Sequence, residues 1–316
     1  MSKKSMFLAR WLTSFCARRR PSPPPTSRRC GTAAALASPF LPADFDPARA
    51  TVTLLAGRGL YPLLCARRIL AAGVRLCLIA SEDAEEELME LLPEERRARY
   101  NAGQIGKLLR RLGEYGSTHA LMAGQVAPKR LFHGLRLDGT AIRLLAGLRR
   151  RNAETIFGAL AREVGRRGVR LLDARCFMEQ DLAREGYMTK TRPRLDQLAH
   201  GIAVARAVAA LNIGQGIVLH RGTVLAVEGF DGTDRMLLRC ADFATDHKWF
   251  IKTSKPDQDL RFDVPVLGLR TLDALAAGGI RALAVEAERT ILLDRENFLR
   301  EADRRRMGIW GYGIVS

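Results

Sequence analysis

The sequence predicts an α/β protein with a Rossmann-like N-terminal domain, built on a parallel sheet, and a distinct C-terminal α/β domain. Two observations lead to this fold class. Short apolar runs alternate with segments of helical spacing, and short loops join them, which is typical of a parallel sheet covered on both faces. The chain also has 316 residues, of which 47% are hydrophobic, and this is enough for two domains with separate cores.

The N-terminal domain is expected over residues 49–135. Its apolar runs predict buried strands, and the segments between them have the periodicity of amphipathic helices. Pro62 suits the first position of one helix, and Gly73 suits its C-terminal end. The expected strands are 51–57, 74–80 and 118–124, and the expected helices are 62–73 and 105–116.

The C-terminal domain is expected over residues 151–316 and is given the catalytic role, with a linker at 136–150. A strand opens it, a long helix rich in small residues follows, and a hairpin turns at Arg221-Gly222. The expected strands are 169–175, 248–254 and a strand pair within 282–294, and the hairpin spans 216–230. Helical stretches are expected at 140–150, 153–168, 194–212, 235–240 and 271–279, with a basic helix at the C-terminus.

The formal charge of +17 is unevenly distributed, because residues 1–30 carry eight Lys or Arg and no acidic residue. The other cations are spread along helices without a zinc-finger or RNP signature, so no nucleic-acid partner is expected. Residues 1–48 are rich in Arg, Ser and Pro, which favours a disordered or mis-started extension over an organellar transit peptide.

Other classes of protein are also disfavoured by the sequence. No apolar stretch reaches the roughly 18 residues that a membrane-spanning helix needs. The six cysteines have no C-x-x-C spacing and the histidines form no H-E-x-x-H pair, so reduced core cysteines in a cytosolic protein are expected and a zinc site is not.

The stretch LLAGRGLYP places Gly57 and Gly59 where a strand turns into a helix, so that bare backbone can approach a phosphate at the helix N-terminus. The third glycine of a dinucleotide fingerprint is absent, although Glu82 after the next strand could bind a ribose. The sequence leaves open whether this segment is only a tight turn or also contacts a nucleotide. Gln104 and Gly124 also lie in loops beside the expected sheet, as ligand contacts or ordinary loop residues.

A second candidate is VEGFDGTDRML, in which Asp231 and Asp234 flank a Gly-Thr pair ahead of a helix. One of these acids can cap the helix. Two carboxylates on a glycine-containing turn also form a half-site for Mg²⁺, which binds one or two carboxylates together with substrate phosphate oxygens. The stretch MTKTRP adds a hydroxyl and a cation of suitable character, Thr189 and Lys190.

The third candidate, SKPDQDLRFDVPVLG, spans residues 254–268 and concentrates charges around two prolines. A solvated surface turn would explain it. The second acidic turn nearby favours instead an active-site loop, in which Asp257, Asp259 and Asp263 position metal and water while Lys255 and Arg261 clamp phosphate oxygens.

Several motifs occur along the chain in one order: AGRGLYP, GQIGKLLRRL, MAGQV, NIGQGIVL, VEGFDGTDRML, KPDQDLRFDVPVLG and LAVEAERTILLD. In this order they resemble the bacterial UDP-2,3-diacylglucosamine pyrophosphatases of the LpxI type, from lipid A biosynthesis. The resemblance runs over about residues 51–311, and its most specific part is the Lys-Pro-x-Gln-Asp-Leu-Arg-Phe-Asp-x-Pro string. Asn212 and Asp231 depart from the acids that the family usually has at these places.

The resemblance implies a Mg²⁺-dependent hydrolase that cleaves UDP-2,3-diacylglucosamine to UMP and 2,3-diacylglucosamine 1-phosphate (lipid X). It also implies a lipid-linked UDP-sugar held between two domains, a homodimer, and a cytoplasmic protein lying peripherally at the cytoplasmic face of the inner membrane. The implied catalytic acids are Asp234, which falls in the Gly-Thr-Asp motif, Asp259 and Asp263, and the expected metal ligands are Asp231, Asp234 and Asp259. Expected substrate contacts are Gly57, Gly59, Gln104, Gly124, Thr189, Lys190, Gln215, Thr233, Lys255, Gln258 and Arg261.

Two other functions are compatible with parts of the sequence. A sugar-nucleotide or dinucleotide-dependent oxidoreductase would use the Gly57-to-Gly59 turn and Glu82, and would need no Mg²⁺. A non-catalytic basic adaptor for RNA or membrane would bind with a steep salt dependence and would not need the acids named above.

Overall fold

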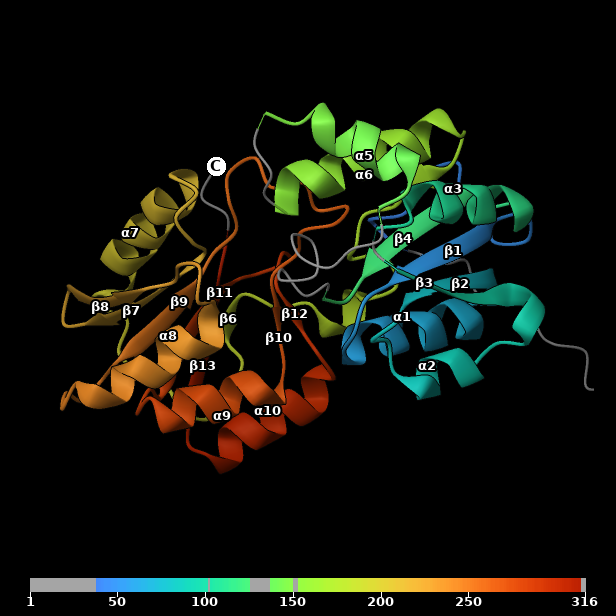
Figure 1. Ribbon diagram of the computed structural model, residues 1–316. Coiled ribbons are helices and arrows are strands. Elements are labelled where there is room, and N and C mark those ends of the chain that lie inside the picture. Colours follow the sequence, from blue (N-terminus) through green and yellow to red (C-terminus); the bar gives the residue numbers. More distant parts are fainter. Residues whose placement is uncertain (1–37, 102, 126–136, 150–152, 314–316) are drawn as a thin grey trace, which may run out of the picture. The chain divides into compact units, whose positions relative to one another are not determined.

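The three central strands of the first sheet are largely apolar and buried, as parallel strands under helices must be. It has five strands in the order β3-β2-β1-β4-β5, all of them parallel (Figure 1). The computed structural model describes residues 38–101, 103–125, 137–149 and 153–313. The strands are β1 (Thr51–Ala56), β2 (Arg75–Ser81), β3 (Arg97–Tyr100), β4 (His119–Ala123) and β5 (Arg170–Leu171).

Helices cover both faces of this sheet (Figure 1). One core contains the apolar faces of α3 and α6 against alternate residues of β1, β2 and β4, and α5 packs beside these helices. On the other face, α1 buries Cys65 and Ile69. The helices are α1 (Leu60–Ala71), α2 (Glu86–Glu90), α3 (Ile105–Glu114), α5 (Gly139–Ala146) and α6 (Ala153–Arg166), with a 3-10 turn at Glu94–Arg96.

The second sheet is mixed, with six strands in the order β6-β13-β11-β9-β7-β8. Strands β13, β11 and β9 run parallel, and β7 and β8 form the expected hairpin, which turns at Arg221 and Gly222 with φ of 45° and 84°. Positive φ at both turn residues is what a tight hairpin requires. The strands are β6 (Gly186–Tyr187), β7 (Gly216–His220), β8 (Thr223–Val227), β9 (Trp249–Lys252), β11 (Ala282–Glu286) and β13 (Gly308–Tyr312).

The two faces of the second sheet are covered unequally. Helices α8, α9 and α10 bury one face, while α7 is the one helix of the described residues that packs on the other (Figure 1). A separate two-stranded ladder joins β10 to β12 in parallel. These elements are α7 (Leu198–Ala210), α8 (Thr233–Arg239), α9 (Leu269–Ala277), α10 (Arg295–Arg304), β10 (Val266–Leu267) and β12 (Ile291–Leu292), with 3-10 turns at Glu179–Asp181 and Cys240–Asp242.

The α/β fold class is confirmed. Strands β3, β6 and β10 and helix α2 were not expected, and three further details differ from the sequence prediction. The strand expected at 169–175 belongs to the first sheet, because the amides of Arg170 and Leu172 donate to carbonyls beside β4. The strands within 282–294 do not pair with each other, because β11 joins the six-stranded sheet and β12 pairs with β10. Strand β13 follows the basic helix and was not expected, because its short apolar run GIWGY carries no alternation.

Residues 37–316 form one compact unit, within which α6 and β5 pack into the core of the first sheet. Helix α5 lies inside the segment expected to be the linker, 136–150, and packs against α3 and α6. We therefore propose that the N-terminal domain extends through β5, and that the connection to the second domain follows residue 171. Residues 1–37 lie outside the described part of the chain, so the expectation for 1–48 concerns mainly undescribed residues.

Candidate functional site

A cavity of about 750 Å³ lies at the carboxyl ends of β1 and β4, where ligands bind in parallel α/β sheets. Side chains from both halves of the chain line it. From the first half come residues after β1 and β4 and two apolar residues of α6: Gly57, Arg58, Gly59, Gly124, Gln125, Phe157 and Leu160. From the second half come Gln215, Asp231, Gly232, Thr233, Asp234, Lys252, Asp263 and the 264–271 segment.

In the first half, the loop after β1 and the loop after β4 are hydrogen-bonded to each other. Arg58 and Gln125 exchange both backbone hydrogen bonds, each 3.0 Å long. A Cβ on Gly57 would lie 2.5 Å from the Gln125 carbonyl oxygen, and one on Gly124 would lie 2.6 Å from Pro62. The packing of these loops is therefore a sufficient reason for both glycines, although both also line the cavity.

Gly59 has φ of 105° and precedes α1. Its amide donates to the Glu85 carboxylate at 2.7 Å, so an acidic side chain already occupies one of the donors at this helix end.

Asp231 and Asp234 line the cavity from the turn before α8. Neither of them caps the helix, because its N-cap is Gly232 with φ of 81° and no side-chain hydrogen bond. Asp231 pairs with Arg239 at 2.9 Å, whereas Asp234 is about half exposed and lies 3.5 Å from the exposed Arg270. Asp234 is therefore the more accessible carboxylate of the two.

Asp263 reaches the same cavity from the 254–268 loop. Its Oδ2 accepts from Gln215 Nε2 at 3.4 Å. Burial raises the pKa of Asp263, and the Glu154 carboxylate adds to this effect, while Lys255, Gln215 and Lys252 oppose it. A carboxylate with a raised pKa beside a cavity is suited to accept a proton from water.

Thr233 belongs to a buried polar network at the floor of the cavity. Lys252 Nζ lies 2.7 Å from Glu228 Oε2 and 3.1 Å from Thr233 Oγ1, and the Thr233 hydroxyl donates to Glu228 Oε1. Sequence reasoning missed Glu228 and Lys252. Lys252 is the last residue of β9, and its position at a strand end is the signal that could have found it.

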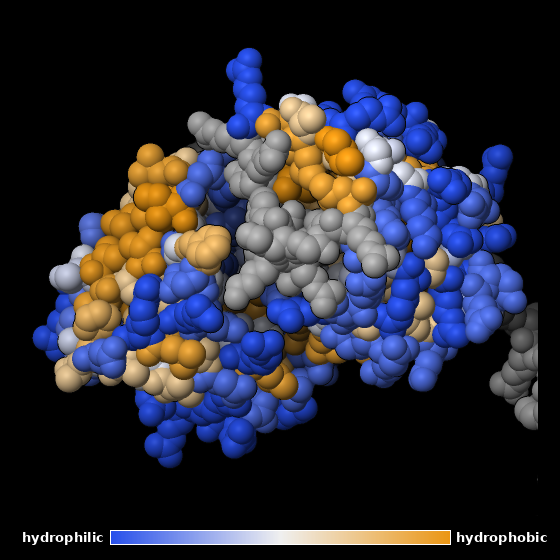
Figure 2. Space-filling model, viewed as in Figure 1, coloured by the Kyte–Doolittle hydropathy of each residue, from blue (hydrophilic) through white to orange (hydrophobic). Residues whose placement is uncertain are grey.

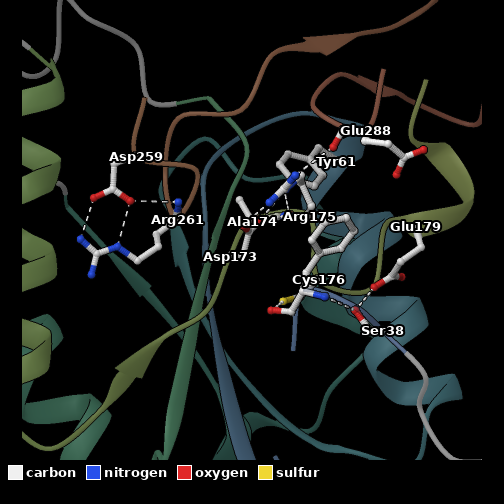
Figure 3. A network of polar contacts seen from close by, with 11 residues as sticks. Ser38, Tyr61, Asp173, Ala174, Arg175, Cys176, Glu179, Asp259, Arg261 and Glu288 are labelled. Atoms are coloured by element: carbon white, nitrogen blue, oxygen red, sulfur yellow. Dashed lines mark hydrogen bonds and ion pairs between the residues drawn. The ribbon is translucent and has the colours of Figure 1, made fainter. Parts of the chain in front are cut away.

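The remaining polar residues of the 254–268 loop bind within the protein. Lys255 Nζ pairs with Glu154 of α6 at 2.7 Å. Gln258 is buried; it accepts from the Lys255 amide at 2.7 Å and donates to the Asp263 carbonyl at 2.8 Å, so it ties the loop together. Arg261 donates two side-chain hydrogen bonds to the Asp259 carboxylate, of 2.6 and 2.8 Å (Figure 3).

This loop is also attached to the segment that follows β5. The amide of Ala174 donates to the Leu260 carbonyl at 2.8 Å, and the hydroxyl of Tyr61 donates to the Ala174 carbonyl. Arg175 forms an ion pair with Asp173 at 2.7 Å and donates to the Glu288 carbonyl at 2.9 Å (Figure 3). These contacts therefore attach the loop that carries Asp263 to residues of both halves of the chain.

Seven expected contacts or ligands are placed outside the cavity lining: Gln104, Thr189, Lys190, Lys255, Gln258, Asp259 and Arg261. Gln104 is the N-cap residue of α3. Thr189 is buried and accepts from the Ile309 amide at 2.8 Å, and the Lys190 amide donates to Asp303 at 2.7 Å. In contrast, Gly57, Gly59, Gly124, Gln215, Thr233, Asp231, Asp234 and Asp263 lie together around one cavity.

The carboxylates in and near the cavity are the candidate ligands for Mg²⁺. Within the described ranges no group of three or more His, Cys, Asp or Glu side chains could hold a metal ion by itself. Asp259 gives both carboxylate oxygens to Arg261, and the hydrogen bonds from Arg261 lower the pKa of Asp259. Asp231 and Asp234 remain at the cavity as carboxylates that fit a cation also held by substrate phosphate oxygens.

The described helices include none that is long and apolar enough to cross a bilayer. Two family models match this chain: the LpxI N-terminal domain at residues 51–180 and the LpxI C-terminal domain at residues 184–310. A curated relative, the UDP-2,3-diacylglucosamine pyrophosphatase LpxI of Caulobacter vibrioides, is 28% identical over 275 residues. The match covers 83% of this chain and 96% of the relative.

Proposed function

This chain belongs to the LpxI family, and we propose that it hydrolyses the diphosphate of UDP-2,3-diacylglucosamine to UMP and 2,3-diacylglucosamine 1-phosphate, a step of lipid A biosynthesis. One observation of the structure carries the proposal. A single cavity brings together carboxylates for water, Asp234 and Asp263, and cations for phosphate oxygens, Arg58 and Lys252. Apolar residues such as Phe157 in the same lining suit the acyl part of the substrate.

The residues divide the chemistry between them. Asp263, whose pKa is raised by burial, accepts a proton from the water that attacks one phosphorus. Attack forms a new P–O bond and breaks the bond to the bridging oxygen, which leaves with one phosphate. Arg58, Arg270 and Lys252 neutralise charge on the phosphate oxygens. Mg²⁺ held by Asp231 and Asp234 would supply further charge neutralisation.

Asp259 has no part in this proposal, because it lies outside the lining and is occupied by Arg261. The oxidoreductase alternative is not favoured, because Glu82 also lies outside the lining and the Gly59 amide holds Glu85.

The proposal is tested by analysing the products of UDP-2,3-diacylglucosamine by mass spectrometry, with wild-type protein and with Asp234→Asn. Release of UMP and lipid X by the wild type, with a loss of about 10²-fold or more in Asp234→Asn, supports it. Wild-type protein that releases neither product refutes it.

We further propose that the protein lies peripherally at the cytoplasmic face of the inner membrane, where a lipid-linked substrate resides. The support is a set of three exposed apolar residues, called the rim here, of which Phe230 and Ile213 lie one and two positions from lining residues in the sequence. Phe230 is fully exposed and precedes Asp231 of the lining, and Leu211 and Ile213 are 71% and 54% exposed. The exposed cation Arg235 on α8 suits anionic lipid.

A homodimer is also part of the proposal, with the outer face of α7 as its interface. This helix is apolar except for His200 and Arg206, and Figure 2 shows the hydrophobic surface over its position. Ala199, Ala203 and Ala207 are exposed at a spacing of four residues, which allows close approach of a second helix. Ala203→Glu is expected to shift the mass measured by light scattering from dimer to monomer, and an unchanged mass would contradict this interface.

A further inference from the structure

We infer that Glu228 is a positioning residue of the proposed hydrolase, which acts through Thr233 and Lys252 to hold the turn that carries Asp234. The inference rests on the proposed function, because it assigns a role in that same reaction. Glu228 does not line the cavity, whereas Thr233, Asp234 and Lys252 do. It can therefore influence the reaction only through those neighbours.

The contacts define the unit. One oxygen of Glu228, Oε1, accepts from the Thr233 hydroxyl. The other, Oε2, lies 2.7 Å from Lys252 Nζ and accepts from the Gln215 amide at 3.3 Å. Thr233 is the first residue of α8 and Asp234 the second, so Glu228 fixes the start of the helix on which Asp234 stands. Helix α8 has no side-chain cap, and the hydrogen bond from the Thr233 hydroxyl to Glu228 anchors its first residue through the side chain instead.

The neighbouring backbone is shaped around this carboxylate. A Cβ on Gly214 would lie 2.0 Å from the Glu228 carbonyl oxygen. A Cβ on Gly216 would lie 2.9 Å from Glu228 Oε2 and 2.8 Å from the Phe250 ring. The two glycines of NIGQGIVL thus let the β7 end approach Glu228 closely, which gives a physical reason for a motif that the cavity lining alone leaves unexplained.

The cost of burying this pair indicates a role beyond stability. The Lys252 and Glu228 side chains are 9% and 12% exposed. Burial raises the pKa of Glu228, but Lys252 and the hydrogen bonds from Thr233 and Gln215 outweigh this effect, so that the pKa is lowered and the group is ionised. A buried ion pair contributes little net stability compared with apolar residues. Its geometry does, however, fix Thr233, Lys252 and the Gln215 amide at the floor of the cavity.

The experiment uses the full chain with Glu228→Gln, Thr233→Val and, as the conservative rescue, Thr233→Ser. Glu228→Gln is expected to lower kcat by about 10²-fold with a smaller change in KM, because a misplaced catalytic group costs this much. Thr233→Val is expected to lower kcat to a similar extent, and Thr233→Ser is expected to retain most activity. If Glu228 acts through Asp234, the double variant Glu228→Gln/Asp234→Asn loses no more than Asp234→Asn alone.

A second measurement does not depend on the substrate. Hydrogen exchange of the amides at the start of α8 is expected to speed up in Glu228→Gln. It should not change in Lys248→Met, which removes the other buried lysine of the same region, bonded to the Cys240 and Gly278 carbonyls at 2.6 and 3.1 Å. Unchanged exchange, or a kcat equal to that of the wild type, overturns the inference. Wild-type inactivity on the substrate overturns the proposed function instead, and the exchange data still decide the role of Glu228 as a tether.

Discussion

Lys255 Nζ lies 2.7 Å from Glu154 Oε2, and this ion pair joins the 254–268 loop to helix α6. The two side chains are 16% and 36% exposed, so water screens them only in part. Phe157 of α6 and Phe262 of the loop also pack against each other, with ring centroids 6.1 Å apart. The pair therefore holds the loop that presents Asp263 against the first domain.

Breaking this pair should loosen the loop rather than remove a phosphate contact. Lys255→Met is expected to lower the free energy of unfolding by about 1 kcal/mol and kcat by about tenfold. Glu154→Gln should give a similar result, because each variant removes the same pair. A large rise in KM for Lys255→Met with none for Glu154→Gln would contradict this reading, since it would show that Lys255 binds substrate directly.

The raised pKa of Asp263 predicts opposite effects on stability and activity. Because the folded protein penalises the charged form, this group costs stability as pH rises from its unfolded pKa through its folded pKa. Asp263→Asn is therefore expected to raise Tm at pH 7 by about 2 °C and to lower kcat by about 10²-fold. Thermal denaturation and the product assay check both. A lower Tm, or unchanged kcat, would contradict the assignment.

Glu228 should show the reverse dependence, because its folded pKa is lowered. Its stabilising contribution is present above its unfolded pKa and is lost as pH falls through its folded pKa. The Tm of Glu228→Gln is expected to lie below that of the wild type at pH 7, and the difference should shrink in acid. A difference that persists unchanged through the acid range would show that the charge of Glu228 is not responsible.

Two buried lysines flank strand β9 and offer a matched comparison. Lys248 precedes the strand and donates to the Cys240 and Gly278 carbonyls, which follow α8 and α9, whereas Lys252 is the last residue of the strand and lines the cavity. Lys252→Met and Lys248→Met should both destabilise the fold, but only Lys252→Met should lower kcat/KM, by about 10²-fold. Equal kinetic losses in the two variants would indicate a general effect of destabilisation.

The exposed rim can be tested with vesicles. Phe230→Ser is expected to weaken sedimentation with vesicles that contain anionic lipid, because about 2 kcal/mol of ring burial is lost. The control is Phe243→Ser, a 39% exposed aromatic that follows the far end of α8. Equal binding of wild type and Phe230→Ser would contradict the membrane proposal for this rim.

The fold was largely predictable because its central strands are apolar runs and its longer helices have clear periodicity, whereas β3 (Arg97–Tyr100) is too polar to give a strand signal. Strand β5 was assigned to the wrong sheet, since a two-residue ladder is fixed by its partner and carries no signal of its own. Strand β13 was missed for a similar reason. These errors concern tertiary pairing rather than local structure.

The site was predictable where residue type and loop position coincide, as for Asp234 and Asp263. Arg261 and Asp259 could not be separated from them by sequence, because whether a charge meets substrate or its own neighbour depends on the turn conformation. Glu228 and Lys252 were missed because each belongs to an apolar stretch that reads as core. Only the sheet order brings these two residues together, through β7 between β8 and β9.

Hydrolysis of the diphosphate is tested most directly by a product assay on UDP-2,3-diacylglucosamine with the 316-residue chain, in Mg²⁺ and again after chelation with EDTA. Asp234→Asn and Lys248→Met serve as the matched inactive and active variants. Wild type and Lys248→Met are expected to release equimolar UMP and lipid X in Mg²⁺, EDTA is expected to suppress the release, and Asp234→Asn is expected to release at least about 10²-fold less. Full activity of Asp234→Asn, or no release by the wild type in Mg²⁺, would contradict the proposed function.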